Sequence, residues 1–174
     1  MNELEKLICE FAAQNVGQQE KPNNSGFINP AFEKQMTLVG FNPGESWCCL
    51  FAELCWSHAF GRLQPAGVAK VSALFSESCL KTWSNAKTSK DFKIGMTPKA
   101  GAVALFQHGT GWTGHAAIVT SYDPKADKDN FLTIEGNTNA AGGREGIEVA
   151  RKKRPLTFAK KPNALNLLGF IYPC

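Results

Sequence analysis

The sequence predicts an α+β domain in which helices from the first half of the chain pack on an antiparallel sheet from the second half. Up to Trp83 the apolar residues recur with a helical period. Beyond Thr97 they form short runs rich in β-branched and aromatic residues, separated by turn-forming segments. Helices followed by strands are typical of the α+β class. The 174 residues, 43% of them hydrophobic, suffice for a substantial core, and we expect a single domain over residues 1–174.

Four helical segments are expected in the first half of the chain. The second begins at Asn29 and Pro30, which provide a cap and a first helical residue. The third contains two adjacent cysteines; Ser46 or Glu45 can cap it, and Gly61 can end it. The expected ranges are residues 4–12, 31–38, 46–60 and 72–83.

Five short runs with strand character make up the second half. Turn-forming segments rich in Gly, Asn and Asp separate them. This arrangement favours an antiparallel sheet with one face on the helices. The runs are GAVALFQH, HAAIVTSYD, FLTIEGNT, GIEVARKK and LLGFIYP.

The charge pattern favours anionic partners without naming one. Nineteen basic and fifteen acidic side chains give a net charge of +4. The densest basic run, residues 151–154, has no aromatic residues between its charges, so the stacking part of a single-strand nucleic-acid site is missing. We expect no nucleic-acid partner, and a solvated strand face explains the run at least as well as a phosphate-binding patch.

Other sequence signals argue against export, membrane insertion and metal binding. No stretch approaches the ~18 apolar residues of a membrane span, and the first residues lack the basic and apolar regions of a secretory signal. We therefore expect a soluble protein made in the cytoplasm. Its six cysteines show neither a C-x-x-C pair nor the paired spacing of zinc sites, so we expect reduced thiols, no metal and no cofactor.

Cys48 is the candidate nucleophile. In the first turn of the third helix, unpaired backbone N–H groups and the helix dipole stabilise an anion, and a nearby imidazolium adds to this effect. Cys49 points about 100° around the helix and cannot share the role. Cys55 lies nearer the Cys48 face, but we interpret it as a core residue.

A thiol nucleophile needs a base, and the chain has three histidines. His58 lies about 15 Å along the same helix from Cys48, which excludes direct contact. His108 and His115 flank a loop between two strands. A lone histidine at a strand end is more often structural, but the small residues that alternate with His115, such as Ala117, leave room for a helix to approach.

The next strand offers a partner for the imidazole. Glu135 and Asn137 share one face by the two-residue period, and Gly136 between them allows another backbone to come close. A buried carboxylate is costly unless it is paired, which favours a hydrogen-bonded role for Glu135, with a salt bridge to a lysine as the alternative. Cysteine, histidine and Glu/Asn in this order outline a cysteine hydrolase.

These motifs together resemble the CHAP amidase/peptidase family of cell-wall hydrolases. The resemblance is carried by GESWCCLFAELCW, TPKAGAVALFQHGTGWTGHAAIVTSYD, FLTIEGNT and LLGFIYP, and it spans about residues 10 to 173. It implies a papain-like fold, with the cysteine at a helix start on an antiparallel sheet. Two departures are Cys49, where the family usually has alanine, and residues 99–102, where it often has Pro-Gly-Asp.

The resemblance also implies the roles of single residues. Cys48 matches the nucleophile, His115 the general base, Glu135 the residue that orients the imidazole, and Asn137 an auxiliary polar group. The implied reaction is hydrolysis of a peptidoglycan amide through a thioester. The oxyanion would be bound by the backbone N–H of Cys48.

Substrate-binding residues follow less directly from the sequence. The loop that contains Asn23 and Asn24 is a candidate for a second oxyanion donor, and Trp112 is a candidate contact for the substrate. A different class of function is a non-catalytic glycan-binding module, in which the basic run and the tryptophans Trp56, Trp83 and Trp112 grip an anionic glycan. A third interpretation is a Cys-His enzyme that acts on protein amides, since such a site does not specify its amide.

Without a signal peptide, a bacteriolytic enzyme would reach the cell wall or periplasm by another route. Lysis late in a phage infection and secretion into a rival cell are both compatible with the sequence. A secreted antibacterial effector would be expected to have an immunity protein that blocks its cleft. The sequence does not choose between a phage lysin and an effector.

Overall fold

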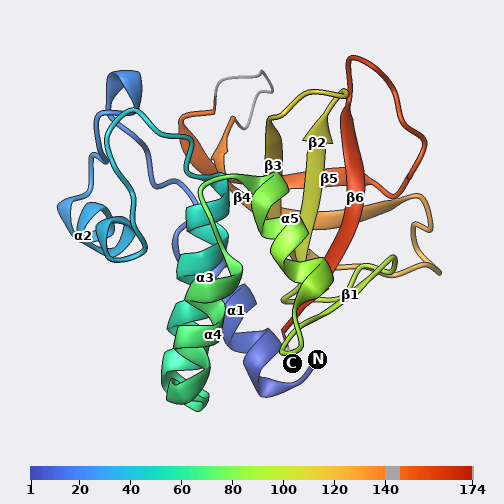
Figure 1. Ribbon diagram of the computed structural model, residues 1–174, viewed down its shortest axis with the longest axis horizontal. Coiled ribbons are helices and arrows are strands. Elements are labelled where there is room, and N and C mark those ends of the chain that lie inside the picture. Colours follow the sequence, from blue (N-terminus) through green and yellow to red (C-terminus); the bar gives the residue numbers. More distant parts are fainter. Residues whose placement is uncertain (140–145, 174) are drawn as a thin grey trace.

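The computed structural model describes residues 1–139 and 146–173, and it has the expected α+β arrangement (Figure 1). The sixth cysteine, Cys174, lies outside the described residues. The α-helices are α1 (Glu3–Gln14), α2 (Pro30–Leu38), α3 (Cys48–Leu63), α4 (Val68–Leu74) and α5 (Cys79–Thr88), with short 3-10 turns at Pro22–Asn24 and Pro65–Gly67. The strands are β1 (Lys93–Gly95), β2 (Val103–His108), β3 (Gly114–Ser121), β4 (Asn130–Thr138), β5 (Glu148–Pro155) and β6 (Leu165–Tyr172).

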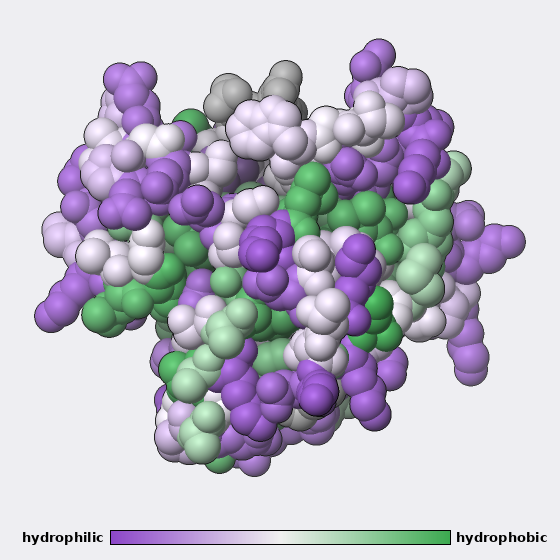
Figure 2. Space-filling model, in the orientation of Figure 1, coloured by the Kyte–Doolittle hydropathy of each residue, from purple (hydrophilic) through white to green (hydrophobic). Residues whose placement is uncertain are grey.

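All neighbouring strands of the sheet pair antiparallel, in the order β1-β6-β2-β3-β4-β5. In Figure 1, β4 and β5 cross behind β2, β3 and β6, as expected for a strongly twisted sheet. Helix α3 packs on β3 and β4, and α5 packs on β2. In the space-filling view, hydrophilic side chains form the projecting parts of this face, and hydrophobic ones show mainly in the recesses between them (Figure 2).

Both faces of the sheet are buried. Ala116 and Ile118 of β3 belong to the apolar cluster that includes the helices. Ala117 and Val119 belong to a second cluster formed by sheet residues such as Phe131. The expectation that residues alternating with His115 face a helix is therefore wrong: the helix contacts the intervening residues, because the twisted sheet covers its other face itself.

Helix α3 differs from the prediction at both ends. It begins at Cys48 with Trp47 as the N-cap residue, and among the described side chains neither Ser46 nor Glu45 caps it. Gly61 does not end the helix, which continues to Leu63. The end is set by Pro65, because a residue before proline is disfavoured in the helical conformation; Gln64 accordingly has φ −143° and ψ 66°.

The single helix expected over residues 72–83 is two helices. Phe75 is extended, and the side chain of Ser78 accepts a hydrogen bond from the backbone N–H of Lys81, which starts α5 at Cys79. Strand β1 was not expected either. It has three residues and pairs with β6, which is too short a segment to show a period in sequence.

Glu53 is an ionisable side chain within the apolar core. It lies in the middle of α3 and is 6% exposed. Burial raises its pKa to about 7, and a hydrogen bond with Ser72 opposes only part of this shift. Between the ordinary glutamate pKa and about pH 7, this carboxyl is therefore protonated in the folded protein and ionised in the unfolded chain. Its contribution to stability is complete below the ordinary glutamate pKa and is lost as pH rises through about 7.

We expect Glu53→Gln to stabilise the protein above pH 7, because the amide fills the same volume and does not have to ionise. The gain in the free energy of unfolding should be on the order of 1–3 kcal/mol there and should shrink as pH falls towards the ordinary glutamate pKa. Urea unfolding across this pH range measures it, with exposed Glu77→Gln as the control. A gain that does not change with pH would contradict the buried, protonated state of Glu53.

Candidate active site

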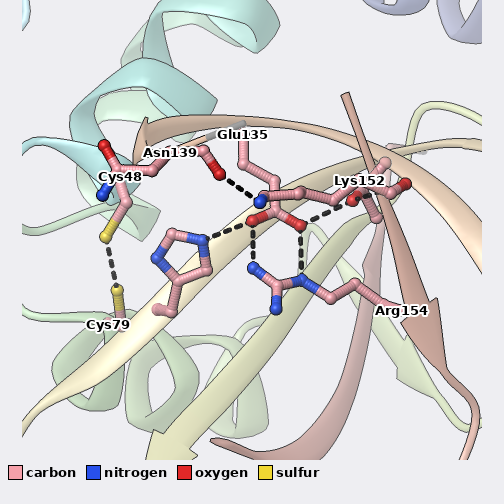
Figure 3. Close-up of polar contacts among 8 residues, drawn as sticks. Cys48, Cys79, Glu135, Asn139, Lys152 and Arg154 are labelled. Atoms are coloured by element: carbon pink, nitrogen blue, oxygen red, sulfur yellow. Dashed lines mark hydrogen bonds and ion pairs between the residues drawn. The ribbon is translucent and has the colours of Figure 1, made fainter. Parts of the chain in front are cut away.

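Cys48 lies where two helices begin. It is the first residue of α3, and Cys79 is the first residue of α5. Both thiols are buried, and their sulfur atoms are 3.5 Å apart (Figure 3). The first turns of two helices therefore bring two cysteines into hydrogen-bond contact.

The surroundings of Cys48 favour its thiolate. A hydrogen bond from Cys79 holds the pKa of Cys48 well below its ordinary value; burial opposes this shift, and the charge and hydrogen bond of His115 and the backbone N–H of Ala116 add to it. The hydrogen bond to Cys48 raises the pKa of Cys79 well above its ordinary value. These opposite shifts favour the anion on Cys48 and the hydrogen-bond donor on Cys79.

Two glycines allow these helices to approach the sheet. A Cβ atom on Gly136 of β4 would lie 2.5 Å from the indole ring of Trp47 and 2.7 Å from Cβ of Phe51. A Cβ atom on Gly114 of β3 would lie 2.5 Å from the carbonyl oxygen of Phe106 and 3.0 Å from Cβ of Cys79. The close approach expected at Gly136 is thus to side chains of α3 and the residue before it, not to a backbone.

His115 is the second residue of β3 and is almost fully buried. Its Nε2 lies 2.8 Å from Oε2 of Glu135, which leaves Nδ1 as the ring nitrogen available to Cys48. Burial alone lowers the pKa of His115, but the charge and hydrogen bond of Cys48, together with Glu135, raise it to about 10. The two shifts together favour a thiolate at Cys48 beside an imidazolium at His115 at neutral pH.

Glu135 is fully buried and fully paired. Its Oε1 accepts hydrogen bonds from Oγ1 of Thr133 at 2.6 Å and from Nε of Arg154 at 2.7 Å. Its Oε2 is in contact with Nη2 of Arg154 and with His115. Burial raises the pKa of Glu135, but these partners, with Arg154 foremost, bring it to about 2. The cation that pairs with this carboxylate is an arginine, not the lysine considered from the sequence.

A β-bulge places Asn137 in the site. The register between β4 and β5 shifts between Glu135 and Thr138, and Asn137 has a positive φ of 52°. A bulge redirects a side chain relative to regular alternation. Asn137 lines a pocket of about 180 Å³ together with Cys48 and His115.

The pockets around Cys48 are adjacent to a larger one. A second pocket, of about 360 Å³, also contains Cys48 and has Trp112 on its wall. A third, of about 620 Å³, shares Trp112 with the second and His108 with the first. Trp112 is 86% exposed, so its ring is available to a ligand on either side of it.

The structure does not bring Asn23 and Asn24 to these pockets, whose described lining residues do not include either. Both have positive φ in a short turn, and the carbonyl of Asn24 accepts a hydrogen bond from the N–H of Gly44. The Glu20 carboxylate next to them accepts a hydrogen bond from Nε1 of Trp47 at 2.6 Å. The segment thus contacts the region just before α3 rather than the sulfur of Cys48.

Other residues considered from the sequence are not among the described residues that line the two pockets around Cys48. His58 stacks on Phe11 with ring centroids 4.0 Å apart. Cys49 donates to Oγ1 of Thr82, and Cys55 is fully buried with its pKa raised by burial, as expected for a core thiol.

Two other kinds of site are absent from residues 1–139 and 146–173. No group of three or more His, Cys, Asp or Glu side chains in these ranges could hold a metal ion. No helix formed by the described residues has the length and apolar character needed to cross a membrane.

Sequence reasoning missed three residues of this network. Cys79 lies inside the single helix expected over residues 72–83, although a serine directly before it is a helix-start signal. Thr133 lies two residues before Glu135, so strand alternation places both on one face. Arg154 has no comparable signal, because its neighbour across the sheet depends on the β4–β5 register.

We expect Cys79→Ala to raise the pKa of the Cys48 thiol by about one pH unit or more, because the thiolate loses its hydrogen-bond donor. The measurement is the pH dependence of Cys48 alkylation by iodoacetamide, followed by mass spectrometry of the modified peptide. Cys55→Ala is the matched control, since it removes another fully buried thiol of α3. An unchanged alkylation midpoint in Cys79→Ala would show that Cys79 does not stabilise the anion.

The comparison with known families agrees with this geometry. The CHAP domain matches residues 40–137, which is more than half of the chain. This range begins shortly before α3, ends in β4, and includes Cys48, His115, Glu135 and Asn137. No curated protein and no solved structure matches the chain. Because the match covers more than half of its length, this protein belongs to the CHAP-domain family, which is of the peptidoglycan amidase and peptidase type.

Proposed function

We propose that this protein is a cysteine-dependent peptidoglycan hydrolase that cleaves an amide bond in the stem peptide or in the cross-link. The observation that carries the proposal is the continuous contact from Cys48 through His115 to Glu135, which opens into a pocket. A thiolate, an imidazolium and an orienting carboxylate are the groups needed for acyl transfer through a thioester.

The reaction begins when Sγ of Cys48 attacks the amide carbonyl carbon. His115 gives its proton to the leaving amine as the carbon–nitrogen bond breaks, which leaves a thioester on Cys48. The neutral imidazole then takes a proton from a water molecule that attacks the thioester. The acid product is released, and the thiolate and imidazolium are restored.

The oxyanion formed in each step needs preorganised hydrogen-bond donors. The backbone N–H of Cys48 is one candidate, because the first N–H groups of a helix have no partner within it. Ser46 lines both pockets that contain Cys48, and Asn137 lines the smaller one. These side chains are better placed as a second donor than Asn23 or Asn24.

The glycan-binding alternative has less support from the fold. Trp56 is fully buried and donates to the carbonyl of Gly101, so it cannot contact a glycan. Within the basic run, Lys153 pairs with Asp127 and Arg154 pairs with Glu135. Trp112 remains exposed, and in our proposal it contacts the peptidoglycan substrate beside the pockets.

The biological setting of the proposal is the bacterial cell wall, reached by phage lysis or by secretion into a rival cell. In the second case an immunity protein would cover the pockets around Cys48. A Cys-His enzyme acting on protein amides is the competing assignment. Mass spectrometry of muropeptides after digestion of purified peptidoglycan separates the two and identifies the bond cut.

We expect Cys48→Ala to abolish hydrolysis of purified peptidoglycan, with a loss of at least about 10³-fold, because the nucleophile is removed. The small side chain fits the same site, so the far-UV spectrum and the melting temperature should stay close to those of the unchanged protein. Cys49→Ala is the control and should retain activity. Full activity of Cys48→Ala would reject the assignment of the nucleophile.

We expect the activity to persist through the neutral pH range and to fall on the alkaline side with a midpoint of about 10. Above this value His115 loses the proton that the leaving amine must receive. The measurement is kcat/KM on a soluble muropeptide as a function of pH. A midpoint at the ordinary histidine pKa would instead indicate an imidazole that is not coupled to a thiolate.

A further inference from the structure

We propose that Arg154 is a positioning residue for His115 and acts through Glu135. The proposal rests on the function proposed above and extends it to a residue of β5. Arg154 lies beyond residues 40–137, which match the family, so the match assigns it no role.

The contacts of Arg154 fix both oxygens of one carboxylate. Its Nε donates to Oε1 of Glu135 at 2.7 Å, and its Nη2 pairs with Oε2 (Figure 3). Thr133 donates to Oε1 from the strand that carries Glu135. A planar guanidinium that binds both oxygens fixes the plane of the carboxylate as well as its distance.

The fixed carboxylate of Glu135 in turn fixes the orientation of the His115 imidazole. Oε2 of Glu135, which pairs with Arg154, is also the oxygen that lies 2.8 Å from Nε2 of His115. Rotation of the carboxylate away from His115 would break both contacts with Arg154. Held in this way, Nε2 stays on Glu135, and Nδ1 stays available to Cys48.

Arg154 is distinct from the other basic residues of its strand. Its side chain is 22% exposed, and its guanidinium lies over the Phe106 ring at 5.8 Å. Lys153 instead pairs with Asp127 at 2.6 Å on the exposed side, and Arg151 is exposed. Alternation along β5 therefore directs only part of the run that the sequence suggested as a phosphate-binding patch towards Glu135.

The charge of Arg154 also matters to the site. Cys48, His115, Glu135 and Arg154 form a row of alternating charges, and removal of the terminal cation makes ionisation of the Glu135 carboxyl and of the Cys48 thiol less favourable. Other titratable groups face this row from the surrounding elements. They are Cys79 of α5, Cys49 of α3, His108 of β2, Lys152 of β5, and Glu45 and Glu77 on the pocket walls.

The test is Arg154→Met, which keeps the length of the side chain but removes its charge and its hydrogen bonds. We expect kcat/KM on a soluble muropeptide to fall about 10- to 100-fold, by analogy with the loss of partners that orient metal-binding histidines. We also expect the pH midpoint for Cys48 alkylation to move upward by about one unit or more. A purely structural role would lower the melting temperature without moving this midpoint.

Arg154→Lys and Arg151→Met are the matched variants. The lysine keeps the charge but not the two-point contact, so the alkylation midpoint should return towards that of the unchanged protein while turnover stays reduced. Arg151→Met makes the same charge change on the exposed side of β5 and should change neither quantity. If Arg154→Met does not fold, a Lys variant with unchanged turnover and an unchanged alkylation midpoint would overturn the proposal.

The alkylation readout separates this proposal from the proposed function. If the unchanged protein fails to hydrolyse peptidoglycan, the midpoint shift in Arg154→Met still shows that Arg154 acts on the thiol through Glu135 and His115. If the unchanged protein is active and Arg154→Met matches it in turnover and alkylation midpoint, the positioning role is wrong and the hydrolase assignment stands.

Discussion

The site depends on the contact between the start of α3 and the end of β4. Trp47 and Phe51 occupy the space that a side chain at residue 136 would fill, so the absence of a Cβ atom at Gly136 sets how close the helix comes to the sheet. The sulfur of Cys48 is carried on that first turn, and its distance from His115 follows from this packing. Gly114 does the same for α5 and Cys79. The reactivity of Cys48 therefore depends on close packing of the two helix starts on the sheet, which two glycines in neighbouring strands allow.

Once the elements meet, electrostatics decides which state the side chains adopt. A buried carboxylate such as Glu135 is unfavourable unless it is paired, and Arg154 and Thr133 supply that pairing together with His115. The carboxylate then favours an imidazolium at His115, and the imidazolium favours a thiolate at Cys48. Each charge stabilises the ionised form of the next side chain, which is buried from water. A change at Arg154 therefore reaches the sulfur without touching it.

The sequence predicted the parts of this arrangement that depend on local patterns. The cost of burying a carboxylate predicted that Glu135 is hydrogen-bonded, and the short motifs identified the family. What it could not predict depends on register and on breaks in helices. The β4–β5 register pairs Arg154 with Phe131 and Glu135 with Ala150, so the approach of Arg154 to Glu135 is visible only once the strands are paired. Cys79 was hidden within a run that looked like one continuous helix, because the extended conformation of Phe75 has no signal in the apolar period.

The pair of cysteines raises the question of which sulfur ionises, since both begin helices and both are buried. Both cysteines begin a helix, so the stabilisation of an anion by a helix start does not determine which thiol ionises. The difference is the imidazolium: His115 stabilises the anion on Cys48, whereas the influences on Cys79 come from burial and from the neighbouring sulfurs, and all of them disfavour its anion. The proton therefore stays on Cys79, which can donate it as a hydrogen bond. Cys79 therefore does not compete with Cys48 as the nucleophile. It stabilises the Cys48 thiolate by a hydrogen bond, because of the two thiols only Cys48 faces the histidine.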